Sequence, residues 1–91
     1  MGNIRASHIL LRNETFCKEL IEKLKTGASF ESLAQQFSQC PSGKKSAGDL
    51  GSFGKGKMVP QFENAAFKLK VGETSGPVKS PFGYHIIKRT A

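Results

Sequence analysis

The sequence predicts an α+β domain whose sheet is at least partly antiparallel. Its elements follow in the order strand, helix, helix, short strand, helix, strand, strand. The last two strands flank the turn residues 80–83, and a turn this short joins only antiparallel neighbours. An antiparallel pair among interspersed helices is typical of the α+β class.

The length allows one domain, residues 1–91, with one small core. Leu, Ile, Val and Phe account for 22 of the 91 residues, a share above the ~20% below which chains tend to be disordered. A domain of this size hides only somewhat more than ~60% of the surface of its unfolded chain. Large two-domain enzymes and dinucleotide-binding folds are therefore excluded by length.

The first predicted element is a strand over residues 4–11, because its side chains alternate between two faces. One face carries Ile4, Ala6, His8 and Leu10, and the other carries Ile9 and Leu11.

Two helices follow before residue 38. Asn13 caps the first, which begins at Glu14 and stops at Gly27, and Ser29 caps the second. Each helix has an apolar stripe at helical spacing. The stripes are Phe16, Cys17, Leu20, Ile21 and Leu24, and then Phe30, Leu33, Ala34 and Phe37.

The second half opens with a loop rich in Ser, Gly and Lys, residues 38–57, within which residues 50–53 form a short strand. Pro60 suits the first turn of a third helix, which Gly72 ends. Segments 74–79 and 84–89 are the two closing strands.

The net charge of +7 is concentrated in this half, because residues 1–39 contribute +1 and residues 40–91 contribute +6. A basic half suggests an anionic partner such as nucleic acid or an acidic protein surface. Lys44, Lys45, Lys55 and Lys57 are the residues that would contact it. The alternative interpretation is a soluble cationic surface without a specific partner.

The chain shows no signal for transport or membrane insertion. Its N-terminus lacks the apolar core of a signal peptide, and no apolar run approaches the ~18 residues of a membrane span. Cys17 and Cys40 have neither metal nor redox spacing, which favours a reducing compartment. We expect a cytoplasmic monomer that binds no membrane. The initiator Met and the complete closing strand favour a whole protein over an excised domain.

One apparent motif does not carry the function. Residues 51–57 fit the G-x-x-x-x-G-K pattern of a phosphate-binding loop, but Met58 follows where Mg²⁺ ligation needs Ser or Thr. No long buried strand precedes the motif. We interpret its glycines as residues that permit tight turns and close backbone approach.

Two histidines and one cysteine are the candidates for a polar site. His8 shares its strand face with apolar residues, and His85 lies in step with Ile87 in the last strand. If the first and last strands pair, the two imidazoles lie side by side; otherwise each is a half-buried histidine with local hydrogen bonds. Cys40 has three interpretations: a nucleophile with a histidine as base, a zinc ligand with both histidines and Asp49, or a small apolar packing residue.

Three apolar side chains, those of Met58, Phe62 and Phe82, lie beside these polar groups in loops or at a helix start. An apolar pocket beside polar side chains is the general form of a ligand site. Phe82 occupies a turn with little core to fill, whereas Met58 and Phe62 fit core packing equally well.

Together these segments resemble the parvulin family of peptidyl-prolyl cis–trans isomerases. Six blocks occur in the family's order: residues 7–11, 30–38, 48–53, 56–62 with 65–67, 76–80 and 82–87. The resemblance implies a four-stranded antiparallel sheet surrounded by four helices. The fourth helix would be one more turn in the 40–50 loop.

The resemblance also implies the site. His8 and His85 correspond to the family's paired histidines, Cys40 to its thiol and Ser80 to a hydroxyl-bearing position, and these four are the implied catalytic residues. The implied proline-binding residues are Leu50, Met58 and Phe62, with Phe82 at the rim. No metal or other cofactor is implied. The implied partners are unfolded or flexible protein segments that contain proline.

The implied activity is acceleration of X–Pro bond rotation, with a role in protein folding. Phosphate-dependent members carry a long basic loop after the first strand, whereas only Arg12 and Asn13 intervene here, so we expect no phosphate requirement. We expect a non-covalent mechanism, because relatives with Asp in place of Cys40 lack the thiol. The alternative function is a non-catalytic basic module that binds nucleic acid or acidic proteins.

Overall fold

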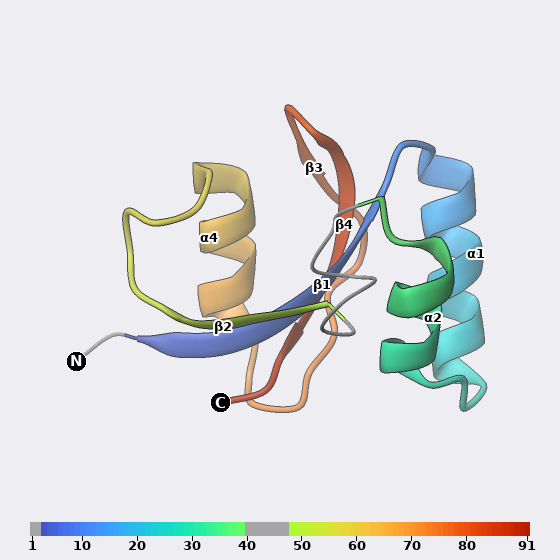
Figure 1. Ribbon diagram of the computed structural model, residues 1–91, viewed down its shortest axis with the longest axis horizontal. Coiled ribbons are helices and arrows are strands. Elements are labelled where there is room, and N and C mark those ends of the chain that lie inside the picture. The colour runs from blue at the N-terminus through green and yellow to red at the C-terminus, as the bar shows by residue number, and fades with distance from the viewer. Residues whose placement is uncertain (1–2, 40–47) are drawn as a thin grey trace.

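Four strands form one sheet with helices on both faces in the computed structural model, which describes residues 3–39 and 48–91 (Figure 1). The strands lie in the order β2-β1-β4-β3, and every neighbouring pair is antiparallel. Their bounds are Ile4–Leu11 for β1, Asp49–Phe53 for β2, Val78–Ser80 for β3 and Gly83–Arg89 for β4. The predicted α+β class and the four-stranded antiparallel sheet are confirmed.

Three helices lie within the described ranges: α1 (Glu14–Lys25), α2 (Phe30–Phe37) and α4 (Pro60–Lys68). The side chain of Asn13 accepts from the backbone N–H of Phe16 at 3.0 Å, and that of Ser29 caps α2 in the same way. These caps satisfy backbone donors that no helical carbonyl reaches. The further helical turn expected in the 40–50 loop falls mostly on residues 40–47, outside the described residues. None of the three helices is long and apolar enough to span a bilayer.

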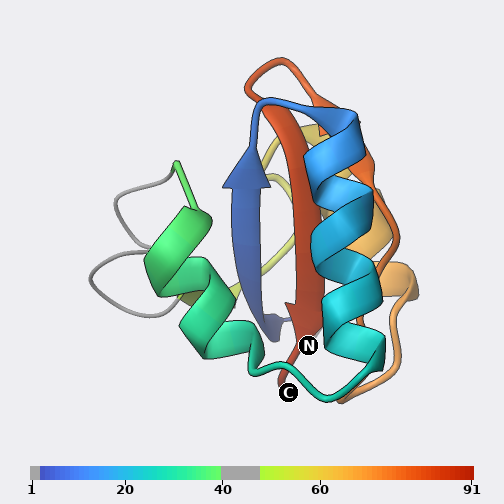
Figure 2. The same cartoon turned by 90° about the vertical axis from the view of Figure 1, so that its right-hand side faces the viewer.

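The helices cover the two faces of the sheet unequally. Helices α1 and α2 lie together over β1 and β4 on one face, and α4 covers the other (Figures 1 and 2). Strand β1 serves both cores, because Ile9 and Leu11 join the α1–α2 core while Ile4 and Ala6 join the α4 core. The alternation read from residues 4–11 is therefore confirmed.

The two ends of the chain meet in the middle of the sheet. Strand β1 pairs with β4 so that His8 lies opposite Ile87 and Leu10 opposite His85. Beyond β4, the backbone N–H of Thr90 donates to the carbonyl of Arg5 at 2.8 Å. This confirms the expected pairing of the first and last strands.

One predicted strand, 74–79, is shorter than expected. Strand β3 begins only at Val78, and before it Thr74 forms a single isolated bridge to Lys88. Pro77 has no N–H to donate to a ladder, which interrupts regular pairing. The hydroxyl of Ser75 accepts from the N–H of Ile87 at 3.0 Å instead, so a side chain replaces a backbone acceptor there.

Candidate functional site

Two buried histidines lie side by side at the centre of the sheet, on the face that α4 covers. His8 on β1 and His85 on β4 are diagonal neighbours across the strand pair, and their side chains are only 5% and 4% exposed. Their Nδ1 atoms are 3.0 Å apart, and their rings stack with centroids 5.2 Å apart at an interplanar angle of 17°. The predicted juxtaposition of the two imidazoles is thus present.

Ser80 extends this pair into a chain of hydrogen bonds. It ends β3, and its Oγ lies 2.6 Å from Nε2 of His85. The same Oγ accepts from the backbone N–H of Phe82 at 3.2 Å, within the turn that joins β3 to β4. Three adjacent strands therefore each supply one polar side chain to a line that runs Ser80, His85, His8.

Burial keeps both histidines neutral at neutral pH. It lowers the pKa of His8 to about 4, with a smaller contribution from the neighbouring His85, and it also lowers the pKa of His85. A neutral imidazole has one N–H donor and one acceptor nitrogen. The line is consistent when the Ser80 hydroxyl donates to Nε2 of His85 and Nδ1–H of His85 donates to Nδ1 of His8.

That arrangement puts the remaining proton of His8 on Nε2, whereas the reverse arrangement, in which both hydrogen bonds run the other way, leaves this nitrogen an acceptor. This nitrogen is buried and has no hydrogen-bond partner within residues 3–39 and 48–91. An unpaired buried donor or acceptor costs stability, and such groups are found where a site has a role beyond folding. Within the described residues, the His8 end of the line is thus the end with an unsatisfied polar atom.

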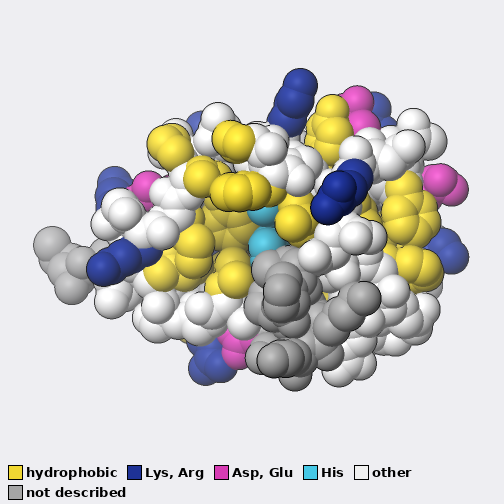
Figure 3. Space-filling view, turned by 45° about the horizontal axis from the view of Figure 1, so that its top comes forward, with side chains coloured by type: hydrophobic (Ala, Val, Ile, Leu, Met, Phe, Trp, Pro, Cys, Tyr) yellow, Lys and Arg dark blue, Asp and Glu magenta, His cyan; other side chains and the backbone are white. Residues whose placement is uncertain are grey.

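An apolar cleft of about 420 Å³ opens directly onto the two histidines. Figure 3 shows the histidine side chains at the bottom of a hollow surrounded by hydrophobic side chains. All four residues predicted to bind substrate line it, namely Leu50, Met58, Phe62 and Phe82. Three further lining residues, Leu10, Lys57 and Val59, were not predicted as part of the pocket. Leu10 was detectable, because it lies two residues from His8 on the same strand face.

Phe62 forms the wall between the cleft and the α4 core. It lies in the first turn of α4 and meets both imidazole rings at near right angles, with centroids 5.5 Å from His8 and 5.3 Å from His85. It is also a buried member of the α4 core. Both interpretations of Phe62, core packing and pocket lining, are therefore correct. Phe82, at the tip of the hairpin, is 65% exposed and borders the cleft from outside.

Gly48 is a site residue that the sequence reading did not single out. Its carbonyl accepts from the N–H of His8 at 2.9 Å, and its φ of +86° is in the left-handed region. A Cβ there would lie 2.4 Å from the carbonyl oxygen of His8, so only glycine fits without a shift. The sequence indicates this position only through the family resemblance, in which Gly48 opens the 48–53 block.

Asp49, the residue after Gly48, forms hydrogen bonds outside the histidine site. The Asp49 carboxylate accepts from the Arg5 guanidinium and, at 2.8 Å, from the N–H of Gly51. These hydrogen bonds, chiefly that of Arg5, hold the pKa of Asp49 below its usual range. Among the described residues, no three His, Cys, Asp or Glu side chains form a group that could hold a metal ion. Cys40 lies outside those residues, so its interpretations as thiol, zinc ligand and packing residue stay predictions.

Comparison with known proteins agrees with this geometry. The family described as the PPIC-type PPIase domain (rotamase) matches residues 8–91. The foldase protein PrsA of Geobacillus kaustophilus is 58% identical over 87 residues, which cover 96% of this chain and 31% of that protein. The chain thus spans about a third of the length of the curated relatives it matches.

Solved structures extend the comparison to three dimensions. The crystal structure of PrsA from Bacillus anthracis superposes with a TM-score of 0.95 and 57% identity, over 98% of this chain and 41% of that one. The parvulin of Nitrosopumilus maritimus superposes with a TM-score of 0.90 and 49% identity, over 100% of this chain and 98% of that one. The described elements therefore correspond to a fold that occurs both within longer proteins and as a protein of this size.

Proposed function

The chain belongs to the PPIC-type peptidyl-prolyl isomerase family, the parvulins, and from that premise we propose that it rotates X–Pro bonds in flexible protein segments by a non-covalent mechanism. The family match confirms the expected membership of the peptidyl-prolyl isomerase family, and the similarity to foldase proteins supports a folding role. The observation that carries the proposed mechanism is the apolar cleft closed at its base by two neutral, hydrogen-bonded imidazoles.

The energy that the site must supply is modest. An uncatalysed X–Pro bond isomerises over tens to hundreds of seconds against a barrier of ~18–20 kcal/mol. An acceleration of ~10³–10⁴-fold corresponds to about 4–5.5 kcal/mol of transition-state stabilisation. No covalent bond has to form or break, so non-covalent contacts with the twisted amide can supply this stabilisation.

The cleft favours the twisted amide because its apolar walls exclude water. Rotation ends the resonance of the amide, and the planar form is the one that water solvates best. Leu50, Met58 and Phe62 offer the prolyl ring an apolar wall in place of water. The planar ground state loses more solvation there than the twisted state does, which lowers the barrier.

The histidine pair acts in this scheme through hydrogen bonds, because neither imidazole carries a charge at neutral pH. The Ser80–His85–His8 line fixes both rings, and Nε2 of His8 is its polar atom without a hydrogen-bond partner within the described ranges. In the twisted amide the lone pair returns to the prolyl nitrogen, so a hydrogen bond from the site favours the twisted state where it reaches that nitrogen and not the carbonyl oxygen. No proton has to be transferred.

We propose further that substrates need no phosphate. Strand β1 ends at Leu11 and α1 begins at Glu14, so Arg12 is the only cation in the connection. A phosphate clamp needs several convergent donors. Arg12 has no second arginine or lysine beside it in this connection, so it does not form such a clamp. A tenfold or greater preference in kcat/KM for a phosphoserine–proline peptide over its plain counterpart would refute this.

A refolding assay limited by proline isomerisation, together with a protease-coupled peptide assay, tests the activity itself. Met58→Ala removes one wall of the cleft, and Val71→Ala removes an exposed apolar side chain outside it. We expect Met58→Ala to lower kcat/KM by about 5- to 30-fold, equivalent to about 1–2 kcal/mol of lost apolar contact, and Val71→Ala to leave it unchanged. Absence of acceleration by the wild-type chain would overturn the proposal.

Two finer predictions, a cytoplasmic location and a monomeric state, stay predictions of the sequence. Cys17 is a buried free thiol whose pKa burial raises to about 11, which suits a reducing compartment without requiring one. Light scattering after gel filtration measures the oligomeric state. Nucleic-acid binding gains no support from the family match, and two of its four predicted lysines, Lys44 and Lys45, lie outside the described residues.

A further inference from the structure

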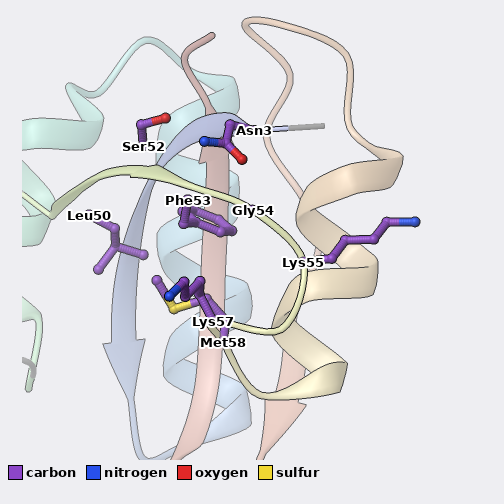
Figure 4. Close-up of a pocket in the computed structure, with 8 residues that line it drawn as sticks. All are labelled: Asn3, Leu50, Ser52, Phe53, Gly54, Lys55, Lys57 and Met58. Carbon is purple, nitrogen blue, oxygen red and sulfur yellow. The ribbon is translucent and has the colours of Figure 1, made fainter. Parts of the chain in front are cut away.

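A second groove adjoins the proline cleft along β2 and the loop that follows it. Its volume is about 660 Å³. Its lining residues are Asn3, Leu50, Ser52, Phe53, Gly54, Lys55, Lys57 and Met58 (Figure 4). Leu50, Lys57 and Met58 line both spaces, so these three side chains form the boundary between cleft and groove.

A substrate of this enzyme is a chain, and its proline has neighbours on both sides. Extended residues advance by ~3.3–3.6 Å each. A prolyl ring held against Leu50 and Met58 therefore has an adjacent residue within one or two steps of the groove. The continuity of the two spaces makes the groove the path of one flanking segment.

The charge along this path has one sign. Lys57 is the only charged side chain among the described residues that line the cleft, and the groove adds only Lys55. Two acidic side chains adjoin this lining: Asp49, next to Leu50, pairs with Arg5, and Glu63 accepts from the N–H of Gly56 at 2.7 Å. Within residues 3–39 and 48–91, Lys57 has no acidic partner.

The two lysines are placed differently. The ammonium of Lys55 lies 5.7 Å from the ring centroid of Phe67, and its side chain points away from the shared boundary in Figure 4. Lys57 lies beside Met58, at that boundary. The Glu63 hydrogen bond fixes Gly56, the residue immediately before Lys57, onto α4. The backbone that leads into Lys57 at the mouth of the cleft is therefore attached to α4.

We infer that Lys57 makes this groove a subsite for a substrate residue that carries a carboxylate and lies within two positions of the proline. The inference rests on the proposed isomerase function and adds a sequence preference to it. An exposed ion pair contributes ~0.2–1 kcal/mol, so the expected preference is about 1.5- to 5-fold in kcat/KM. It stays below the tenfold level that would indicate a dedicated phosphate site.

The test measures kcat/KM for pairs of peptides that differ only by Glu against Gln at each of the two positions before and after proline. For the wild-type chain we expect Glu to exceed Gln by the stated factor at one or more positions on one side. The ratio should approach one in 1 M NaCl, where the Debye length is ~3 Å. A ratio of one at all four positions in low salt overturns the inference.

Substitutions assign the preference to a residue. Lys57→Met keeps the aliphatic stem and should bring the ratio to one, and Lys57→Glu should favour Lys over Gln at the same position. Lys23→Met, on α1 over the opposite face of the sheet, changes the net charge equally and should keep the wild-type ratio. Retention of the Glu preference in Lys57→Met overturns the inference.

The two levels of the proposal fail separately. Turnover of the Gln peptides by the wild-type chain measures the isomerase activity alone. If these peptides turn over and the Glu to Gln ratio is one, the subsite is wrong and the isomerase stands. If no peptide turns over, the proposed function itself is wrong.

Discussion

Acidification should destabilise this domain well above the pH at which its carboxylates titrate, because unfolding exposes His8 to protonation. The perturbation is a change of pH from 7.5 to 5. His8 is 5% exposed and holds a neutral imidazole against Phe62 and His85. Its pKa in the folded chain is about 4, against an ordinary value of 6.5.

The sign follows from proton binding. The folded-state pKa of His8 lies below the unfolded value, so between pH 6.5 and pH 4 the unfolded chain binds the extra proton. The stability contributed by neutral His8 is fully present above pH 6.5 and declines as pH falls towards 4. At pH 5 the loss is about 2 kcal/mol, because 1.5 pH units below the unfolded pKa correspond to that free energy. His85 shifts in the same direction and adds to the loss.

Urea unfolding at pH 7.5, 6 and 5 measures this, followed by far-UV circular dichroism because the chain has one Tyr and no Trp. Asp49 does not contribute to the change between pH 7.5 and 5, because Arg5 holds its pKa below the usual range. The stability that ionised Asp49 contributes is lost only at lower pH. We expect the wild-type free energy of unfolding to fall by at least about 2 kcal/mol, out of a typical ~5–15 kcal/mol.

The control variant His8→Leu lacks the titrating group. The test compares the pH dependence of the free energy of unfolding, which should be smaller by about 2 kcal/mol in this variant over the same range. Equal stability of the wild-type chain at pH 7.5 and pH 5, within about 0.5 kcal/mol, would show that His8 does not link stability to pH. An unchanged pH dependence in His8→Leu would show the same.

Three further outcomes are expected. Ser80→Ala leaves Nε2 of His85 without its partner and should lower the free energy of unfolding by about 1–3 kcal/mol in urea titrations, whereas Ser80→Thr retains the hydroxyl. Gly48→Ala should cost more than about 1 kcal/mol, and clearly more than Gly27→Ala, which shares a positive φ but has open space around the added Cβ. Cys40→Asp should keep most turnover in the peptide assay; near-complete loss would instead support a nucleophilic thiol.

The starts of α1, α2 and α4 and the extent of β1 were predictable to within a residue or two, whereas α4 ends at Lys68 and not at the predicted stop, Gly72. Asn13 and Ser29 cap α1 and α2 as expected, and the alternation over residues 4–11 gives both the extent and the two faces of β1. These features depend on backbone donors and side-chain periodicity within a few residues. His8, His85, Met58, Phe62 and Phe82 were candidates from the sequence pattern, and the family resemblance added Leu50. The structure brings all six to one cleft.

The features that the sequence did not reveal depend on long-range geometry. The need for glycine at position 48 arises from a carbonyl oxygen 40 residues earlier in the chain, on β1. The early part of the expected strand 74–79 is replaced by a hydroxyl contact from Ser75 to β4. Lys57 borders the cleft from the β2–α4 loop, which a hydrogen bond from the N–H of Gly56 to Glu63 attaches to α4. None of these contacts leaves a periodic or local trace in the sequence.

The central strand pair unites the stability of this domain with its chemistry. His8 and His85 are 77 residues apart in the chain and meet only when β1 and β4 pair. The same pairing brings Ile9 to Ile86 in one core and Ala6 towards Ile87 in the other. A charged pair at this position would carry a large desolvation cost, whereas neutral imidazoles joined by hydrogen bonds carry a small one. The burial that completes a small core thereby also selects the uncharged state of both histidines, which the proposed mechanism requires.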